Sequence, residues 1–199
     1  MKKTTVKIED QLQASFRTVD NEMGLGKIIY NEDSHESIIT NGKSLITYTN
    51  SQLEESLKVS EGERERISNL AKHLIHSNYG DMIACELYFY KEDVVDLLRY
   101  MNEHSCNTIK LTFNNKLNVV LASVDGDASL VKILQPAQIN TFKNVDMSCT
   151  VEMEQLLNVS ELLYQEMTVD SLLGVALQYK GRPVLLATEN VSACISCIK

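Results

Sequence analysis

Short runs of apolar residues alternate with polar ones along most of the chain, and turn residues separate the runs. In the stretches 84–90, 107–113 and 117–124 the apolar side chains recur at about every second position, which is typical of a strand with one buried face. Residues 92–104 instead carry apolar side chains at helical spacing, and this pattern predicts an amphipathic helix. A fourth strand is expected at 128–134, so that these elements form a βαβββ unit.

The same order of elements is predicted a second time further along the chain. The predicted elements are a helix at 155–167 and strands at 148–153, 171–179, 182–188 and 191–198. An offset of 64 residues places Cys149 on Cys85. The offset becomes 65 after the middle turn and returns to 64 in the last strand, where it places Ile198 on Leu134. We therefore expect an internal duplication.

Neither copy of this unit could bury its own sheet, because one helix and four short strands leave too much apolar surface exposed. Two copies could complete each other's core if they packed about a pseudo-twofold axis, with both helices side by side on one face of antiparallel sheets. The expected fold class is therefore α+β. The two units together predict one domain at 82–199. It consists of the halves 82–134 and 147–199 and a connector at 135–146.

Residues 1–80 predict a β-rich segment with one helix. Strands are expected at 3–8, 26–30, 37–40 and 44–49. The Asn41-Gly42 pair between the last two is a strong signal for a hairpin. Ser60 and Glu63 have the spacing of a capping box, and apolar residues at helical spacing continue from there to about Ser77.

The net charge of −8 argues against a protein whose whole surface grips nucleic acid, although it permits a local basic face. No window of about 18 uncharged apolar residues is present in the sequence, so we expect no membrane-spanning helix and no membrane partner. The five cysteines lack the spacing of a disulfide framework. Reduced thiols in an intracellular, reducing compartment are therefore expected.

No catalytic motif stands out in the sequence, which has no nucleophile elbow, no Ser-His-Asp arrangement and no glycine-rich phosphate loop. The CxxC spacing of Cys194 and Cys197 is compatible with a redox or metal site. A strand over these residues would point their side chains to opposite faces, however, and no second CxxC pair completes a zinc site. Buried structural cysteines are therefore favoured. We expect a protein that is not an enzyme and that holds no cofactor and no metal.

Two stretches resemble a known family. Residues 85–115, CELYFYKEDVVDLLRYMNEHSCNTIKLTFNN, and the hairpin at Gly181-Arg182-Pro183 are similar to segments of the DNA sliding clamps, and most closely to subunits of the heterotrimeric DNA-damage checkpoint clamp. The resemblance covers about residues 82–199. It implies a sliding-clamp-like architecture in which the helices line the hole of a ring. Because a full clamp subunit has two such domains, residues 1–80 are a candidate part of a first one.

The resemblance implies a noncatalytic subunit that assembles edge to edge, with sister clamp subunits or with copies of itself, into a DNA-encircling or DNA-tethered complex. It further implies a nuclear protein of DNA-damage checkpoint signalling or repair. The alternative is a small intracellular adaptor or regulatory domain that acts through protein–protein contacts without binding DNA. A ring or a mixed trimer would support the clamp, and a stable monomer with closed sheet edges would support the adaptor.

Contact with double-stranded DNA would require cations that neutralise phosphates. The candidates are Arg64, Arg66, Lys72, Lys91 and Arg99. The connector offers a candidate surface for a partner peptide at Gln138, Ile139 and Phe142, where two apolar side chains stand in a polar segment. The alternative is that these two side chains cover the edge of a sheet.

Overall fold

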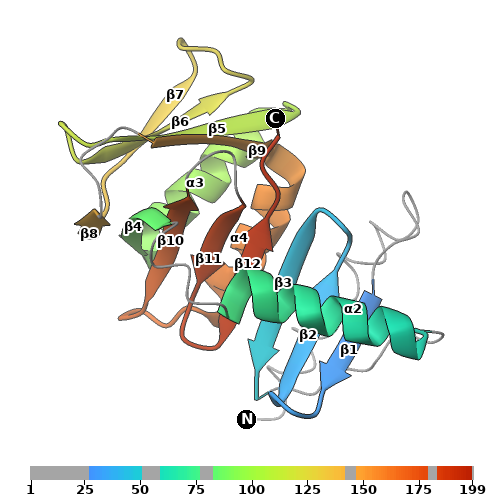
Figure 1. The fold of residues 1–199 in the computed structure, drawn as a ribbon. Helices are drawn as coiled ribbons and strands as arrows, with labels where there is room; N and C mark the ends of the chain where they lie inside the picture. The colour runs from blue at the N-terminus through green and yellow to red at the C-terminus, as the bar shows by residue number, and fades with distance from the viewer. Residues whose placement is uncertain (1–26, 51–58, 77–82, 142–146, 179–182, 199) are drawn as a thin grey trace. The chain divides into compact units, whose positions relative to one another are not determined.

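The computed structural model describes residues 27–50, 59–76, 83–141, 147–178 and 183–198 (Figure 1). Its internal contacts divide the chain into two compact units. The first unit contains Met1–Ser77 and Asn190–Ala193, and the second contains Asn78–Glu189 and Cys194–Lys199. Several predicted features lie outside the described residues, namely the strand at 3–8, the helix end after 76 and the turn at Gly181-Arg182.

In its described residues, the first unit is an antiparallel meander covered by one α-helix. Its elements are β1 (Lys27–Asn31), β2 (Glu36–Thr40), β3 (Ser44–Thr49), α2 (Glu61–Ala71) and the π-helical turn η1 (Lys72–His76). Ile29 and Ile38 lie opposite each other in β1 and β2, and with Leu45 they form a buried cluster against Ile67 and Ala71 of α2. The helix is therefore held by an apolar stripe on the face that it turns to the sheet.

The predicted hairpin at Asn41-Gly42 is confirmed between β2 and β3. Gly42 has a φ of 84°, a left-handed conformation that a glycine adopts without strain. The Asn41 side-chain oxygen accepts hydrogen bonds from the backbone N–H groups of Lys43 at 3.0 Å and Ser44 at 2.8 Å. An asparagine can replace backbone partners in this way, which is why it favours such turns.

The two predicted βαβββ halves lie in the second unit, except that residues 191–193 of the last strand belong to the first unit. The first half consists of β4 (Ile83–Tyr90), α3 (Lys91–Glu103), β5 (Thr108–Asn114), β6 (Val119–Val124) and β7 (Val131–Leu134). The second half consists of β9 (Met147–Glu152), α4 (Met153–Glu166), β10 (Leu172–Gln178), β11 (Val184–Ala187) and β12 (Val191–Ile195). One further strand, β8 (Gln138–Thr141), lies in the connector.

The two halves exchange their first strands. One sheet has the order β7-β6-β5-β9, so that β9 of the second half pairs with β5 of the first, with Cys149 opposite Leu111. In the other sheet, which runs β11-β10-β4-β8 within this unit, β4 of the first half pairs with β10 of the second, with Leu87 opposite Val175. Helices α3 and α4 contact each other (Figure 1). The expected α+β fold of duplicated units with adjacent helices on antiparallel sheets is confirmed.

The offset between the halves differs from the prediction in the last strand. Residues 125–130 join β6 to β7, whereas only 188–190 join β11 to β12. Because this turn is shorter, the last strand of the second half begins and ends earlier in the sequence than the offset of 64 predicts. It ends at Ile195. The expected match of Ile198 with Leu134 is therefore wrong, since Ile198 lies beyond the strand.

Candidate nucleic-acid and partner interfaces

Three of the five candidate cations lie in the first unit, on α2 and η1. Arg64 is half-buried and turns towards β1, where its Nη1 donates a hydrogen bond to the carbonyl oxygen of Tyr30 at 3.2 Å. Arg66 and Lys72 are exposed. Arg66 lines an open depression together with Glu65 and His73. Of these three cations, the two exposed ones are accessible to a phosphate backbone.

The other two candidate cations lie on α3 in the second unit, and both have acidic or carbonyl partners. Lys91 Nζ donates to the carbonyl oxygen of Met167 at 2.5 Å and lies 4.6 Å from the centre of the Tyr164 ring. Lys91 thus satisfies a carbonyl at the C-terminal end of α4, where a cation is favourable. Arg99 is exposed and lies 3.4 Å from the Asp96 carboxylate.

Carboxylates outnumber cations on the two helices of the second unit. Lys91 and Arg99 are the two cations in α3, and α4 has none. The carboxylates of these helices are Glu92, Asp93, Asp96, Glu103, Glu154, Glu161 and Glu166. Asp96 also accepts a hydrogen bond from Lys132 of β7 at 3.0 Å, and this contact lowers the pKa of the Asp96 carboxyl. The negative balance disfavours phosphate contact by these helices alone.

The connector forms a strand that the sequence pattern did not predict. Gln138 and Ile139 belong to β8, where they pair with Tyr88 and Leu87 of β4. Gln138 is exposed and Ile139 is half-buried, whereas Phe142 lies outside the described residues. The backbone of Gln138–Thr141 thus covers the edge of β4, and the peptide-binding role of these residues stays a prediction.

The edge strand β7 exposes apolar side chains. It pairs with β6 on one side, and it is the outer strand of its sheet in the described part of the chain. Val131 is 38% exposed and Ile133 is 63% exposed. The other two residues of the strand face inward, Lys132 towards α3 and Leu134 into the core. Exposed edges in soluble proteins are usually protected by charges or proline. An apolar edge of this kind is suited to pairing with another strand.

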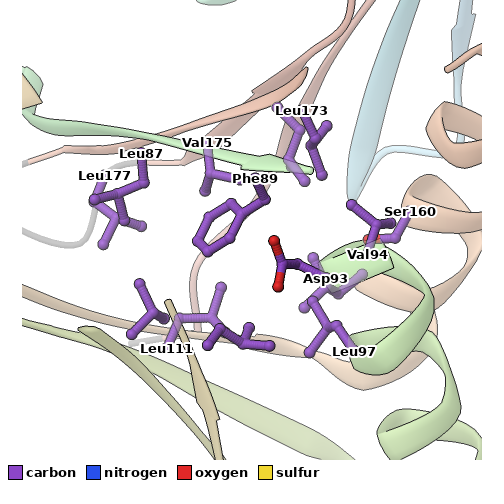
Figure 2. Close-up of a pocket in the computed structure, with 14 residues that line it drawn as sticks. Leu87, Phe89, Asp93, Val94, Leu97, Leu111, Ser160, Leu173, Val175 and Leu177 are labelled. Carbon is purple, nitrogen blue, oxygen red and sulfur yellow. The ribbon is translucent and has the colours of Figure 1, made fainter. Parts of the chain in front are cut away.

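A small cavity of about 30 Å³ lies inside the second unit (Figure 2). The Phe89 ring and the Asp93 carboxylate point into it, with Leu97 and Leu111 close by. Asp93 also accepts a hydrogen bond from the Tyr90 N–H at 3.2 Å, which caps the start of α3. A cavity of this volume can hold a water molecule but no cofactor.

The cysteines are placed differently from the sequence-based expectation in one respect. Cys194 is buried in β12, and burial raises its pKa to about 12, as befits a structural residue. Cys197 lies beyond β12, and its side chain shares a hydrogen bond with Cys149 of β9. Reasoning from the local CxxC spacing missed this contact, because it depends on the pairing of distant segments.

The described ranges contain neither a side-chain cluster for a metal ion nor a helix suited to crossing a membrane. No group of three or more histidine, cysteine, aspartate or glutamate side chains there could hold a metal ion. None of the helices in that part of the chain is long and apolar enough to cross a membrane.

No family model and no curated protein matches the chain. Solved structures do match. The Helicobacter pylori beta clamp bound to a DNA ligase peptide aligns with a TM-score of 0.58 and 12% identity over 98% of this chain and 63% of that chain. DNA polymerase III subunit beta from Borrelia burgdorferi, in complex with a natural product, aligns with a TM-score of 0.55 and 13% identity over 97% and 62%.

The chain spans less than two thirds of the length of these proteins. It spans 42% of the beta subunit of the Streptococcus pyogenes DNA polymerase, with a TM-score of 0.46 and 11% identity over 82% of this chain. At such low identity the likeness concerns the fold. The exchanged strands and the paired helices, together with the two alignments above a TM-score of 0.5, give this chain a sliding-clamp-like fold.

Proposed function

We propose that this protein is a noncatalytic clamp-like subunit that assembles edge to edge into a DNA-encircling or DNA-tethered complex. The observation that carries the proposal is the second unit itself, whose two halves exchange strands and set α3 and α4 side by side. The same fold occurs in the beta clamps of H. pylori and B. burgdorferi.

The edge of β7 is the proposed assembly surface, and its proposed occupant is the edge strand of a sister subunit or of a second copy. Val131 and Ile133 support this assignment, because their exposed side chains would be covered when another strand extends the sheet. The backbone N–H and C=O groups on the outer side of β7 would gain partners in the same step. Residues 1–80, with their three described strands and α2, are proposed as part of a first clamp-like domain.

DNA contact is proposed for the exposed cations Arg66, Lys72 and Arg99. Arg64 and Lys91 are better assigned to holding Tyr30 and Met167 in place. Because α3 and α4 carry more carboxylates than cations, we expect this subunit to bind DNA weakly by itself and to depend on its partners for the rest.

Partner peptides are proposed at Gln138, Ile139 and Phe142. The H. pylori beta clamp holds a DNA ligase peptide, which supports peptide binding as a property to be tested in this chain. A role in DNA-damage checkpoint signalling or repair, in the nucleus, is the finer proposal, and it depends on the resemblance of residues 85–115 to the checkpoint clamp subunits.

The acidic helices favour one alternative, an adaptor that works through protein contacts without DNA. Two measurements separate the two functions. Sedimentation of the purified chain should show a ring or a defined oligomer, whereas a monomer at all concentrations favours the adaptor. Binding to a fluorescent duplex should weaken as salt rises, with a slope that reports the number of phosphates neutralised.

The charge-reversal variant R66E/K72E tests the DNA contact directly. We expect weaker binding and a salt slope smaller by about 2, since each phosphate contact contributes about one unit. The matched control is K110E/K116E, which makes the same charge change at two exposed lysines of β5 and the turn after it. If both variants bind as the original protein does, the DNA part of the proposal is wrong.

A further inference from the structure

Two thiols that are far apart in the sequence meet in the second unit. Cys149 lies in β9, and Cys197 lies in the segment after β12. The backbone N–H of Ile198 donates to the carbonyl oxygen of Thr150 at 2.7 Å, so the C-terminal segment runs beside β9. The side chains of Cys149 and Cys197 share a hydrogen bond, both residues are half-buried, and neither is in a disulfide.

Each sulfur also receives a backbone N–H. Leu111, which lies opposite Cys149 in the sheet, donates to the Cys149 sulfur. Val184 at the start of β11 donates to the Cys197 sulfur. The pair is therefore held by β5, β9 and β11 together, rather than being two surface thiols that happen to be close.

The hydrogen bond makes the two thiols unequal. The Cys149 S–H donates to Cys197, and this contact lowers the pKa of Cys197, helped by the Val184 N–H and opposed by burial. The same contact, together with burial, raises the pKa of Cys149. Cys197 is thus the more acidic of the two thiols, and Cys149 is its hydrogen-bonding neighbour. A thiol of lowered pKa beside a second cysteine is the arrangement found in redox-sensitive thiol pairs.

We propose that Cys149 and Cys197 form a hydroperoxide-sensitive thiol pair that closes into a reversible disulfide. This site goes beyond the proposed clamp function, and its test does not depend on that function. It also assigns a role to Cys197 that its spacing from Cys194 could not suggest.

The chemistry is a two-electron oxidation with a hydroperoxide as the oxidant. The Cys197 thiolate attacks the terminal oxygen of the peroxide, the O–O bond breaks, and the departing alkoxide or hydroxide takes up a proton. This step leaves a sulfenic acid on Cys197. The Cys149 sulfur then attacks the Cys197 sulfur, the S–S bond forms, and the sulfenic oxygen leaves as water with the Cys149 proton. Two thiols are oxidised and one hydroperoxide is reduced to an alcohol, or to water for hydrogen peroxide.

The other three cysteines are poor competitors for the oxidant. Cys85 and Cys194 are buried, and burial raises the pKa of Cys85 to about 11 and that of Cys194 to about 12. Cys106 is half-buried, and its pKa is raised by desolvation and by the Asp125 carboxylate. Oxidation should therefore be selective for Cys197, because the thiolate is the reactive form.

The experiment exposes the folded full-length chain to hydrogen peroxide and maps its peptides without reduction by mass spectrometry. We expect a Cys149–Cys197 cross-link that a dithiol reductant reverses. In C149S, which lacks the second thiol, a sulfenic acid should instead persist on Cys197 and react with dimedone. In C197S both products should disappear, whereas C106S, the matched control, should still form the cross-link.

Three results would overturn the proposal. The first is that hydrogen peroxide modifies Cys197 no faster than Cys106, because we expect the rate at Cys197 to be higher by about tenfold or more. The second is a cross-link that pairs Cys149 with Cys85, or Cys197 with Cys194. The third is an unchanged unfolding temperature after complete cross-linking, because a disulfide that ties the C-terminal segment to β9 should raise that temperature.

Discussion

At the scale of the residue, individual aspartate carboxylates stabilise a turn of the second unit through hydrogen bonds. The Asp125 carboxylate accepts hydrogen bonds from the backbone N–H of Thr108 at 2.9 Å and from its hydroxyl at 3.0 Å, which joins the turn after β6 to the start of β5. Asp127 does the same for Ser129 within that turn. These contacts favour the ionised form and lower the pKa of both carboxyls.

The Asp125 contact predicts a pH-dependent stability. Because the folded-state pKa of Asp125 is below the ordinary value of 3.8, its contribution is complete above that pH and is lost as the pH falls through the folded pKa. D125N should therefore unfold at a lower urea concentration than the original protein at about pH 7, and the gap should narrow below about pH 4. D170N, in an exposed turn, is the control. A gap of equal size at both pH values would contradict the assignment.

Ser160 is a second residue with a measurable effect. Its side chain is 1% exposed, lines the internal cavity, and has no hydrogen-bond partner among the described residues. Since an unsatisfied buried hydroxyl costs about 1–3 kcal/mol, S160A should raise the free energy of unfolding by about 1 kcal/mol. S171A removes a hydroxyl that donates to Thr168 and should not stabilise. A loss of stability in S160A would show that the hydroxyl is bonded, for example to a water in the cavity.

At the scale of the element, some helices and strands are set by local sequence signals and others by tertiary contacts. The helix α2 begins with the predicted capping box, in which Ser60 Oγ accepts from the Glu63 N–H at 3.3 Å and the Glu63 carboxylate accepts from the Ser60 N–H at 3.3 Å. Glu63 also forms an ion pair with Lys27 of β1. The cap therefore joins the helix to the meander as well as starting it.

Removal of this cap should weaken the first unit. S60A leaves the Glu63 N–H without its side-chain partner, and such replacements cost about 1 kcal/mol. Hydrogen exchange of the first-turn amides of α2 should become faster, while the amides of α3 in the second unit should be unchanged. S68A, within the same helix, is the control and should not accelerate exchange. Equal effects of the two variants would mean that the cap is not formed in solution.

Periodicity was sufficient where an element is defined by its own side chains. Strands such as β5 and β10 and helices such as α3 were predicted from the spacing of their apolar residues, and the duplication followed from the order of elements. β8 was not predicted, because Gln138 and Asn140 show no apolar alternation and the strand exists through pairing with β4. The sequence pattern also did not predict contacts between distant segments, such as those of Lys91 with Met167 and of Cys149 with Cys197.

The proposed assembly gives a prediction at the scale of the whole molecule. V131K/I133K places two charges on the outer face of β7, where desolvation on pairing with another strand would be costly. We expect self-association to weaken by about tenfold or more, with little change in the unfolding of the separate chain. Sedimentation at several concentrations measures the first property, and urea titration the second.

The control for this variant is L117K, at an apolar side chain that is 67% exposed in the turn between β5 and β6. It should leave the oligomeric state unchanged. If L117K and V131K/I133K dissociate the assembly equally, general surface hydrophobicity and not the β7 edge drives it. If the original protein does not self-associate, the edge is not an interface between its own copies.

The crossing of β4 and β9 between the halves has a consequence for a cut in the chain. Each half supplies one strand to a sheet of the other half, and residues 135–146 are the covalent link between the halves. Cleavage within that stretch should leave two pieces that remain associated, since each supplies a strand that the other needs.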